Sequence, residues 1–313
     1  MADKTAIGYA LIVIASVCLP LHLSILWIFL RKSEYRKLIA FQIMISLGIM
    51  DCFHLLAHIF SGIMTILTSR IHAVVERLVG SIILSSWIGM VGMIFVLALN
   101  RAVVLTRVNL PKIKETTAFH ALSVLIWLFY FSIIGLHLTD EGRIVYRERE
   151  SSFSYAINSF NHYLEKYESY CIFAFLVASF VCYLGIALWI VYHKGMQVGK
   201  HKIERRELRV LVQAVIIFAY MTTLRCTWHY GAMLYLKNIV VMNTLNILTC
   251  LVGGLNPMLY LTFNKNLRSH FLRMLRVKGR IEPMWQKKIS KNLSVTRAST
   301  EERRNKTGWM SRS

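Results

Sequence analysis

Long apolar stretches separated by short, basic segments dominate this chain. Seven of them approach or exceed the roughly 20 residues that an α-helix needs to cross about 30 Å of hydrocarbon. They run from Ile7 to Leu30, Leu38 to Leu67, Leu78 to Leu105, Ala118 to Leu138, Ser169 to Tyr192, Val210 to Leu236 and Ile239 to Phe263. Arg225 and His229 interrupt the sixth stretch, which is the least regular. The pattern predicts an all-α membrane protein, a seven-transmembrane helix bundle.

The basic residues alternate between the two sides of the predicted bundle. Most of the 37 Lys and Arg residues fall in 31–37, 101–117, 193–209 and the segment after 263. Because cytoplasmic loops carry an excess of Lys and Arg, this predicts a multi-pass plasma-membrane protein with its N-terminus outside and its C-terminus cytoplasmic. The same topology, together with contact of the tail with anionic membrane lipid, explains the net charge of +21. No nucleic-acid partner is therefore expected.

Beyond residue 263 the chain becomes amphipathic. Leu267, Phe271 and Leu275 recur at four-residue intervals among basic side chains, which places them on one face of a helix. We expect a C-terminal amphipathic interfacial helix, followed by a tail that is too polar to fold. The predicted organisation is a short extracellular N-terminus at 1–6, a seven-helix transmembrane domain at 7–263, the amphipathic helix at 264–277 and a basic disordered cytoplasmic tail at 278–313.

Composition and motifs argue against enzymatic chemistry. Hydrophobic residues make up 56% of the chain and charged residues only 17%, a balance unusual for a soluble enzyme. The chain contains no Gly-rich phosphate loop, no His-Glu-x-x-His pair and no Gly-x-Ser-x-Gly elbow. The cysteines lie within or at the edges of the spans and lack the spacings of metal ligands. We expect no enzyme activity, no cofactor and no metal site.

Polar residues inside the spans are the strongest functional candidates, because each is costly in hydrocarbon. Asp51 lies about 20 Å along its helix from Leu38, which places it near mid-membrane. Asn256-Pro257 interrupts the seventh span, where an Asn side chain and water can satisfy carbonyls that proline leaves free, so the helix can bend there. Arg101 lies near the inner end of the third span, where, taken alone, a snorkelling anchor explains it as well.

These motifs, in this order, resemble the rhodopsin-like seven-transmembrane receptor superfamily and, more closely, the nematode serpentine chemoreceptors of the Srt class. The resemblance covers roughly residues 9–276. It is carried by RKSEYRK at 31–37, GIMDC at 48–52, LALNR at 97–101 and YLTFNKNLR at 260–268. It implies a chemosensory G-protein-coupled receptor that binds a small external ligand and activates a heterotrimeric G protein. Arrestin at the tail and a sensory-cilium location belong to the same expectation.

The resemblance also implies roles for the polar residues of the spans. Arg101 would contact the G protein at the inner face, with Asn100 in place of the usual acid. Asp51 and Asn256, next to Pro257, would form a polar core beneath the ligand, and Tyr260 would be the switch residue that swings inward. Because Asn100 cannot form the usual ion pair, a looser inactive state is expected.

Three departures from the superfamily pattern qualify this picture. Glu76 lies near the place of the cysteine that usually ties down the second outer loop, so the loop from Thr139 to Glu168 is expected to be held by packing alone. Met90 replaces a hydroxyl and is a poor ligand for a hard cation, so whether Asp51 binds sodium or is protonated stays open. Ile83 stands where amine receptors carry an acid, which disfavours an amine ligand.

Depth in the membrane and position on a helix face select the candidate ligand contacts. They are Ser86, Trp87, His58, Arg225, Trp228 and His229. Arg225 lies about 24 Å along the helix from Arg209, in the outer half of the membrane, where it could meet an anionic or polar ligand. An arginine paired to a neighbouring helix or snorkelling outward explains Arg225 as well, and core packing explains the histidines, serine and tryptophans.

Two other functions remain open from the sequence. In a seven-span transporter or channel, Asp51, Arg225 and the histidines would form an ion or proton path, and flux would depend on Asp51 but not on Arg101. A protein that traffics or scaffolds without signalling would show neither flux nor G-protein activation.

Overall fold

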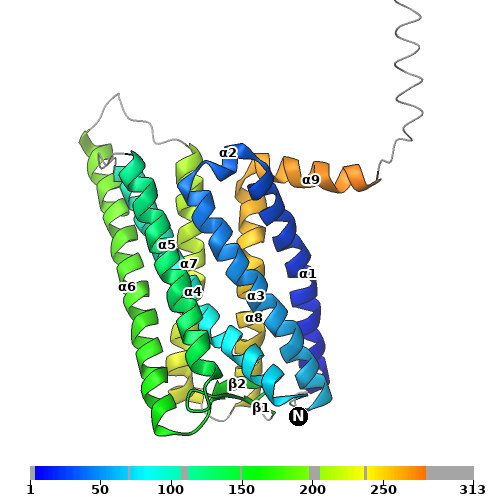
Figure 1. Ribbon diagram of the computed structural model, residues 1–313. Helices are drawn as coiled ribbons and strands as arrows, with labels where there is room; N and C mark the ends of the chain where they lie inside the picture. The colour runs from blue at the N-terminus through cyan, green and yellow to red at the C-terminus, as the bar shows by residue number, and fades with distance from the viewer. Residues whose placement is uncertain are drawn as a thin grey trace, which may run out of the picture. The chain divides into compact units, whose positions relative to one another are not determined.

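The computed structural model describes residues 4–69, 71–106, 112–148, 150–196, 205–235 and 238–279. Seven helices in this part of the chain are long and apolar enough to cross a membrane, which confirms the predicted bundle. They are α1 (Lys4–Arg31), α3 (Ile39–Leu67), α4 (Ala73–Thr106), α5 (Lys112–Leu138), α6 (Ser159–Met196), α7 (Arg205–Tyr235) and α8 (Ile239–Phe263). Figure 1 shows them running side by side.

Shorter elements mark the two ends of this bundle. A single helical turn, α2 (Ser33–Arg36), connects α1 to α3, and a hairpin of β1 (Ile144–Arg147) and β2 (Ser152–Tyr155) follows α5. The hairpin and α2 lie at opposite ends of the bundle (Figure 1), which we name the hairpin end and the α2 end.

The last described helix, α9 (Lys265–Gly279), corresponds to the amphipathic helix predicted at 264–277. The Asn264 side chain accepts a hydrogen bond from the Leu267 backbone N–H at 3.1 Å, which caps the start of α9. The chain divides into a unit that ends at Arg268 and a second unit that begins at Ser269. Residues 1–3 of the predicted N-terminal segment and residues 280–313 of the predicted tail lie outside the described residues.

Small residues allow α1 and α3 to pack closely. A Cβ atom placed on Gly8 would lie 2.8 Å from the Gly62 carbonyl oxygen, and one placed on Gly62 would lie 2.8 Å from the Gly8 carbonyl oxygen. Membrane helices approach this closely only where the side chains are very small. The Gly8–Gly62 contact therefore fixes the distance between α1 and α3.

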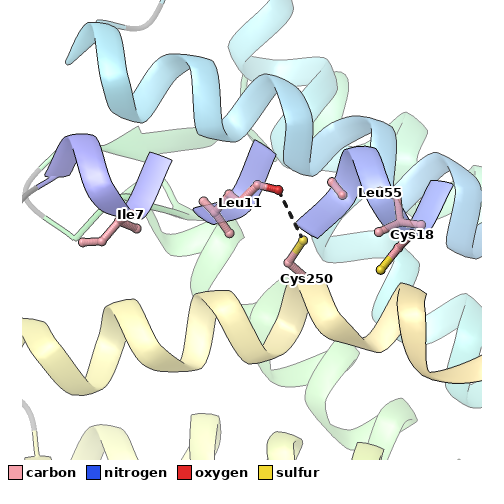
Figure 2. Packing of buried hydrophobic residues seen from close by; sticks show 6 residues of the cluster. Ile7, Leu11, Cys18, Leu55 and Cys250 are labelled. Carbon is pink, nitrogen blue, oxygen red and sulfur yellow. Dashed lines mark hydrogen bonds between the residues drawn. The ribbon is translucent and has the colours of Figure 1, made fainter. Parts of the chain in front are cut away.

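Apolar side chains from three helices fill the space beside this contact. The cluster comprises Ile7, Leu11, Ala15 and Cys18 of α1, Leu55 of α3 and Cys250 of α8 (Figure 2). The Cys250 thiol also lies 3.8 Å from the Leu11 carbonyl oxygen, the contact drawn as a dashed line in Figure 2. Helices α1, α3 and α8 are thus held together by close packing.

The hairpin and the start of α6 differ from the sequence prediction. Residues 139–168 were expected to form only a loop, yet β1 and β2 pair antiparallel with Ile144 opposite Tyr155. Helix α6 begins at Ser159, ten residues before the predicted span, because hydropathy does not register its polar first turns. The Asn158 side chain accepts a hydrogen bond from the Asn161 N–H at 2.7 Å, a cap that starts the helix there.

Hydrogen bonds connect the hairpin to the helices, so the expectation that packing alone holds this loop is wrong. A Glu76 carboxylate oxygen of α4 accepts from the Tyr146 backbone N–H at 2.7 Å. Asn246 of α8 donates its side-chain N–H to the Ser151 carbonyl oxygen at 2.6 Å, and the Tyr146 and Thr65 hydroxyls are 2.8 Å apart. We name these three contacts the hairpin latch. Burial raises the pKa of the Tyr146 phenol, which keeps that hydroxyl protonated.

Candidate ligand pocket and activation core

A pocket of about 270 Å³ opens at the hairpin end of the bundle. Its wall combines Trp87 of α4, Phe153 of β2, Ser169 of α6, the Arg225 and Trp228 side chains of α7, and Asn246 of α8. Pockets for drug-sized molecules usually measure about 300–1,000 Å³, so this one fits a small ligand. Its wall combines the aromatic rings of Trp87, Phe153, Tyr155 and Trp228 with several polar side chains, and such a mixture can both enclose and orient a ligand.

Neighbouring hydroxyl groups hold two of the pocket's side chains in place. An Arg225 guanidinium N–H donates to the Ser169 hydroxyl at 2.7 Å, and the Trp228 indole N–H donates to the Thr249 hydroxyl at 3.0 Å. Because these contacts join α7 to α6 and to α8, a ligand in the pocket would influence how three helices pack.

A buried carboxylate next to the pocket joins four elements. One Glu168 oxygen lies 2.8 Å from His137 Nε2, and the other accepts from the Tyr155 hydroxyl at 2.8 Å. The second His137 ring nitrogen lies 3.2 Å from the Ser85 hydroxyl. Burial beside Glu168 raises the pKa of Tyr155 well above its usual 10, so the phenol remains a donor at physiological pH.

The structure places four of the six predicted ligand contacts in this pocket: Trp87, Arg225, Trp228 and His229. Ser86 and His58 are not among the lining residues. The Ser86 hydroxyl instead donates to the Ile82 carbonyl oxygen at 2.6 Å. The His58 ring packs against His54, with 3.1 Å between their Nε2 atoms, and is fully buried.

Several lining residues were not identified from the sequence. Asn246 and Thr249 line the pocket from α8, and the strand residues 152–155 line it from the hairpin. The two α8 residues carried a signal, since a polar side chain in an apolar span is a functional candidate by default. The strand residues carried none, because a four-residue strand in a long polar loop has no clear pattern.

A polar core lies deeper among α1, α3 and α8. The Asn256 side-chain amide donates to an Asp51 carboxyl oxygen at 2.5 Å, and His22 Nε2 lies 3.5 Å from the same oxygen. Pro257 has no N–H, so the Gly253 carbonyl four residues earlier lacks its helical partner. His22 Nδ1 lies 3.0 Å from this carbonyl and donates to it. A histidine, rather than the expected asparagine, thus satisfies the carbonyl that proline frees.

Arg101 lies 14 residues beyond Trp87 along α4, in the wall of a cavity of about 370 Å³ at the α2 end. Its guanidinium donates to the Asn100 side-chain oxygen at 2.6 Å, and both side chains are buried. The neutral Asn100 therefore holds Arg101 through a hydrogen bond, which is weaker than a bond to a carboxylate.

Tyr260 of α8 lies in an aromatic cluster at the α2 end. Its ring centroid is 5.6 Å from that of Phe29, which in turn contacts Tyr35 at 5.4 Å and Phe41 at 5.2 Å. These four side chains also line a cavity of about 180 Å³. The buried Tyr260 hydroxyl makes no hydrogen bond to any described residue. A movement of the ring that brought this hydroxyl to a hydrogen-bond partner would therefore be favourable.

Comparison with protein families decides the identity of the chain. The model of the family described as "Serpentine type 7TM GPCR chemoreceptor Srt" matches residues 1–282. The chain belongs to this family. The Srt-family match covers all seven membrane helices, the pocket and the polar core.

Comparison of structures agrees with this assignment. The Srt-family chain resembles the crystal structure of squid rhodopsin, with a TM-score of 0.68 and 13% sequence identity over 87% of this chain and 85% of that chain. At this identity the similarity shows the fold alone, a rhodopsin-like helix bundle. A search of curated protein sequences finds no match. Within the described residues, no group of three or more His, Cys, Asp or Glu side chains could hold a metal ion.

Proposed function

We propose that this chain is a chemosensory G-protein-coupled receptor of the plasma membrane, with the hairpin end outside and the α2 end facing the cytoplasm. The alternation of basic loops supports this orientation. A small external ligand would bind the pocket at the hairpin end, and a heterotrimeric G protein would bind at the α2 end.

One observation carries the proposal: α4 contributes to a cavity at each end of the bundle. Trp87 lines the pocket at the hairpin end, whereas Asn100 and Arg101 line the cavity at the α2 end. Between them, the Asp51–Asn256 hydrogen bond joins α3 to α8 in the buried polar core. A shift of α4 or α8 at the pocket would therefore be felt at both the core and Arg101.

Activation would shift an equilibrium between two helix arrangements, and the ligand would drive it by binding one arrangement more tightly. The Pro257 bend supplies a place where α8 can change direction. The Tyr260 hydroxyl, which has no partner among the described residues, would gain one in the active arrangement. The Asn100–Arg101 bond would break as Arg101 turns toward the G protein.

The test is G-protein activation in cells, with and without pooled small odorants, at matched surface levels of each variant. We expect Arg101→Ala to abolish both basal and odorant-evoked signals. Arg36→Ala is the matched control, because Arg36 is an exposed basic residue near the same end and should signal normally. Undiminished signalling by Arg101→Ala would refute the proposed role of Arg101.

Buried histidines favour one second candidate, an ion or proton path. His22 lies beside Asp51, and the His54 and His58 rings contact each other with centroids 4.5 Å apart. This candidate requires ion flux across reconstituted membranes that disappears in Asp51→Asn and is unchanged in Arg101→Ala. A protein that traffics or scaffolds without signalling would show neither flux nor G-protein activation.

A further inference from the structure

Arg225 is a cation in the ligand pocket, and no described residue forms an ion pair with it. Its one hydrogen bond to a described residue is to Ser169, and its Nε atom is buried without an acceptor in the same part of the chain. No carboxylate oxygen of the described residues lies within 4.0 Å of its guanidinium. Arg225 is partly buried, and a charge that is partly withdrawn from water gains from an opposite charge beside it, so this pocket favours an anion.

Two acidic residues, Glu168 and Glu165, attract the charge of Arg225 from nearby but do not contact its guanidinium. Both oxygens of Glu168 are already within hydrogen-bond distance of other groups, one at His137 and one at Tyr155. Glu165 lines the pocket as well, but its side chain is exposed to solvent, where water screens its charge. The pocket therefore still offers an arginine that a bound anion can neutralise.

The shape of the guanidinium and the pocket wall narrow the class of anion. Arginine has five N–H donors in a planar fork that matches a carboxylate with two parallel hydrogen bonds, and the described residues accept from only one of them. The wall around it includes the apolar surfaces of Trp87, Phe153 and Trp228. The volume of about 270 Å³ has room for one small ligand molecule.

We propose that the ligand is a small organic monocarboxylate, a proposal that rests on the proposed receptor function. Its carboxylate would bind the Arg225 guanidinium, and an aromatic or short aliphatic body would pack against Trp87, Phe153 and Trp228. Neutral analogues of the same shape would fill the apolar part but leave the arginine without a counter-charge.

The test measures binding to purified receptor in lipid nanodiscs by thermal shift. The probes are benzoate, phenylacetate and hexanoate at up to about 10 mM, each compared with its uncharged amide. We expect at least one carboxylate to stabilise the wild type and its amide to bind about 30-fold more weakly or worse. Arg225→Gln should lose the preference for the carboxylate. Arg77→Gln is the matched control, because Arg77 pairs with Asp140 at 2.7 Å and does not line the pocket.

Each outcome decides the ligand class. Equal binding of a carboxylate and its amide, undiminished carboxylate binding by Arg225→Gln, or no binding of any of the three carboxylates would overturn the proposal. If Arg225→Gln does not fold, the wild-type comparison of carboxylate with amide decides alone.

The same preparation separates this proposal from the receptor function. Carboxylate binding without any G-protein activation would support the ligand class and count against the receptor function. Basal activation that depends on Arg101, with no carboxylate binding, would support the receptor function and count against the ligand class.

Discussion

Removing the Glu76 carboxylate should loosen the hairpin while the helix bundle stays folded. In the structure, Glu76 accepts the Tyr146 backbone N–H at 2.7 Å in a buried site. In Glu76→Ala this N–H would have no acceptor in place of the lost carboxylate. A buried donor left without its partner costs about 1–3 kcal/mol, so local opening of the hairpin should increase by about 5- to 150-fold. The Thr65 and Asn246 contacts of the hairpin latch remain in this variant, so the hairpin keeps two of its three anchors.

Glu76→Gln separates the hydrogen bond from the charge. Its amide oxygen still accepts from the Tyr146 N–H, so opening should increase by less than in Glu76→Ala, because a neutral acceptor is weaker than a carboxylate. Asp140→Ala is the control. It removes an acidic side chain that is 88% exposed at the same end of the bundle, and such surface pairs contribute little.

Hydrogen–deuterium exchange of receptor in nanodiscs measures the effect, read from peptides that cover residues 140–156. The expected order of exchange rates is Glu76→Ala, then Glu76→Gln, then Asp140→Ala and wild type together. Exchange in Glu76→Ala that equals wild type would show that the latch does not hold the loop. Equal acceleration in the helices would show that Glu76 supports the whole bundle instead.

Three further predictions concern the bundle, the pocket and the core. Gly62→Ala should cost about 1–3 kcal/mol in thermal unfolding, because its Cβ would lie 2.8 Å from a backbone oxygen of α1, whereas Gly135→Ala, with no atom within 4 Å, should cost nothing. Burial raises the pKa of Tyr155, so the folded state keeps a proton that the unfolded chain releases above a pH of about 10. The stability of the wild type should therefore fall as the pH rises above that value. Thermal unfolding measured against pH should show this decrease in the wild type but not in Tyr155→Phe. Asn256→Ala removes the donor 2.5 Å from buried Asp51 and should lower the melting temperature. An unchanged melting temperature would refute a structural contribution of that bond.

Hydropathy predicted the helices well, because a span must be both long and apolar to cross a bilayer. The observed helices extend beyond the predicted spans where the ends are polar, as at Ser159 of α6 and Ala73 of α4. The hairpin could not be predicted in the same way, since each strand has four residues and its contacts come from distant helices. The latch residues Glu76 and Asn246 lie 70 and 95 residues from their partners.

The candidate pocket was predicted only in part, because depth along a helix does not fix which side a residue faces. Ser86 and Trp87 are at nearly the same depth, yet consecutive residues point about 100° apart, and Trp87 alone lines the pocket. Asp51 and Asn256 are 205 residues apart, and the structure brings them together in one hydrogen bond. Their roles in signalling stay predictions.

The hairpin latch has a consequence for how ligand preference can change over evolution. At Tyr146 and Ser151 the latch uses backbone atoms, an N–H and a carbonyl oxygen, which nearly any residue supplies. Side chains of β2 that line the pocket, such as Phe153, can therefore be replaced by single mutations without removing these two anchors. Substitutions in this strand could therefore change which ligands bind while Glu76 and Asn246 hold the loop in position.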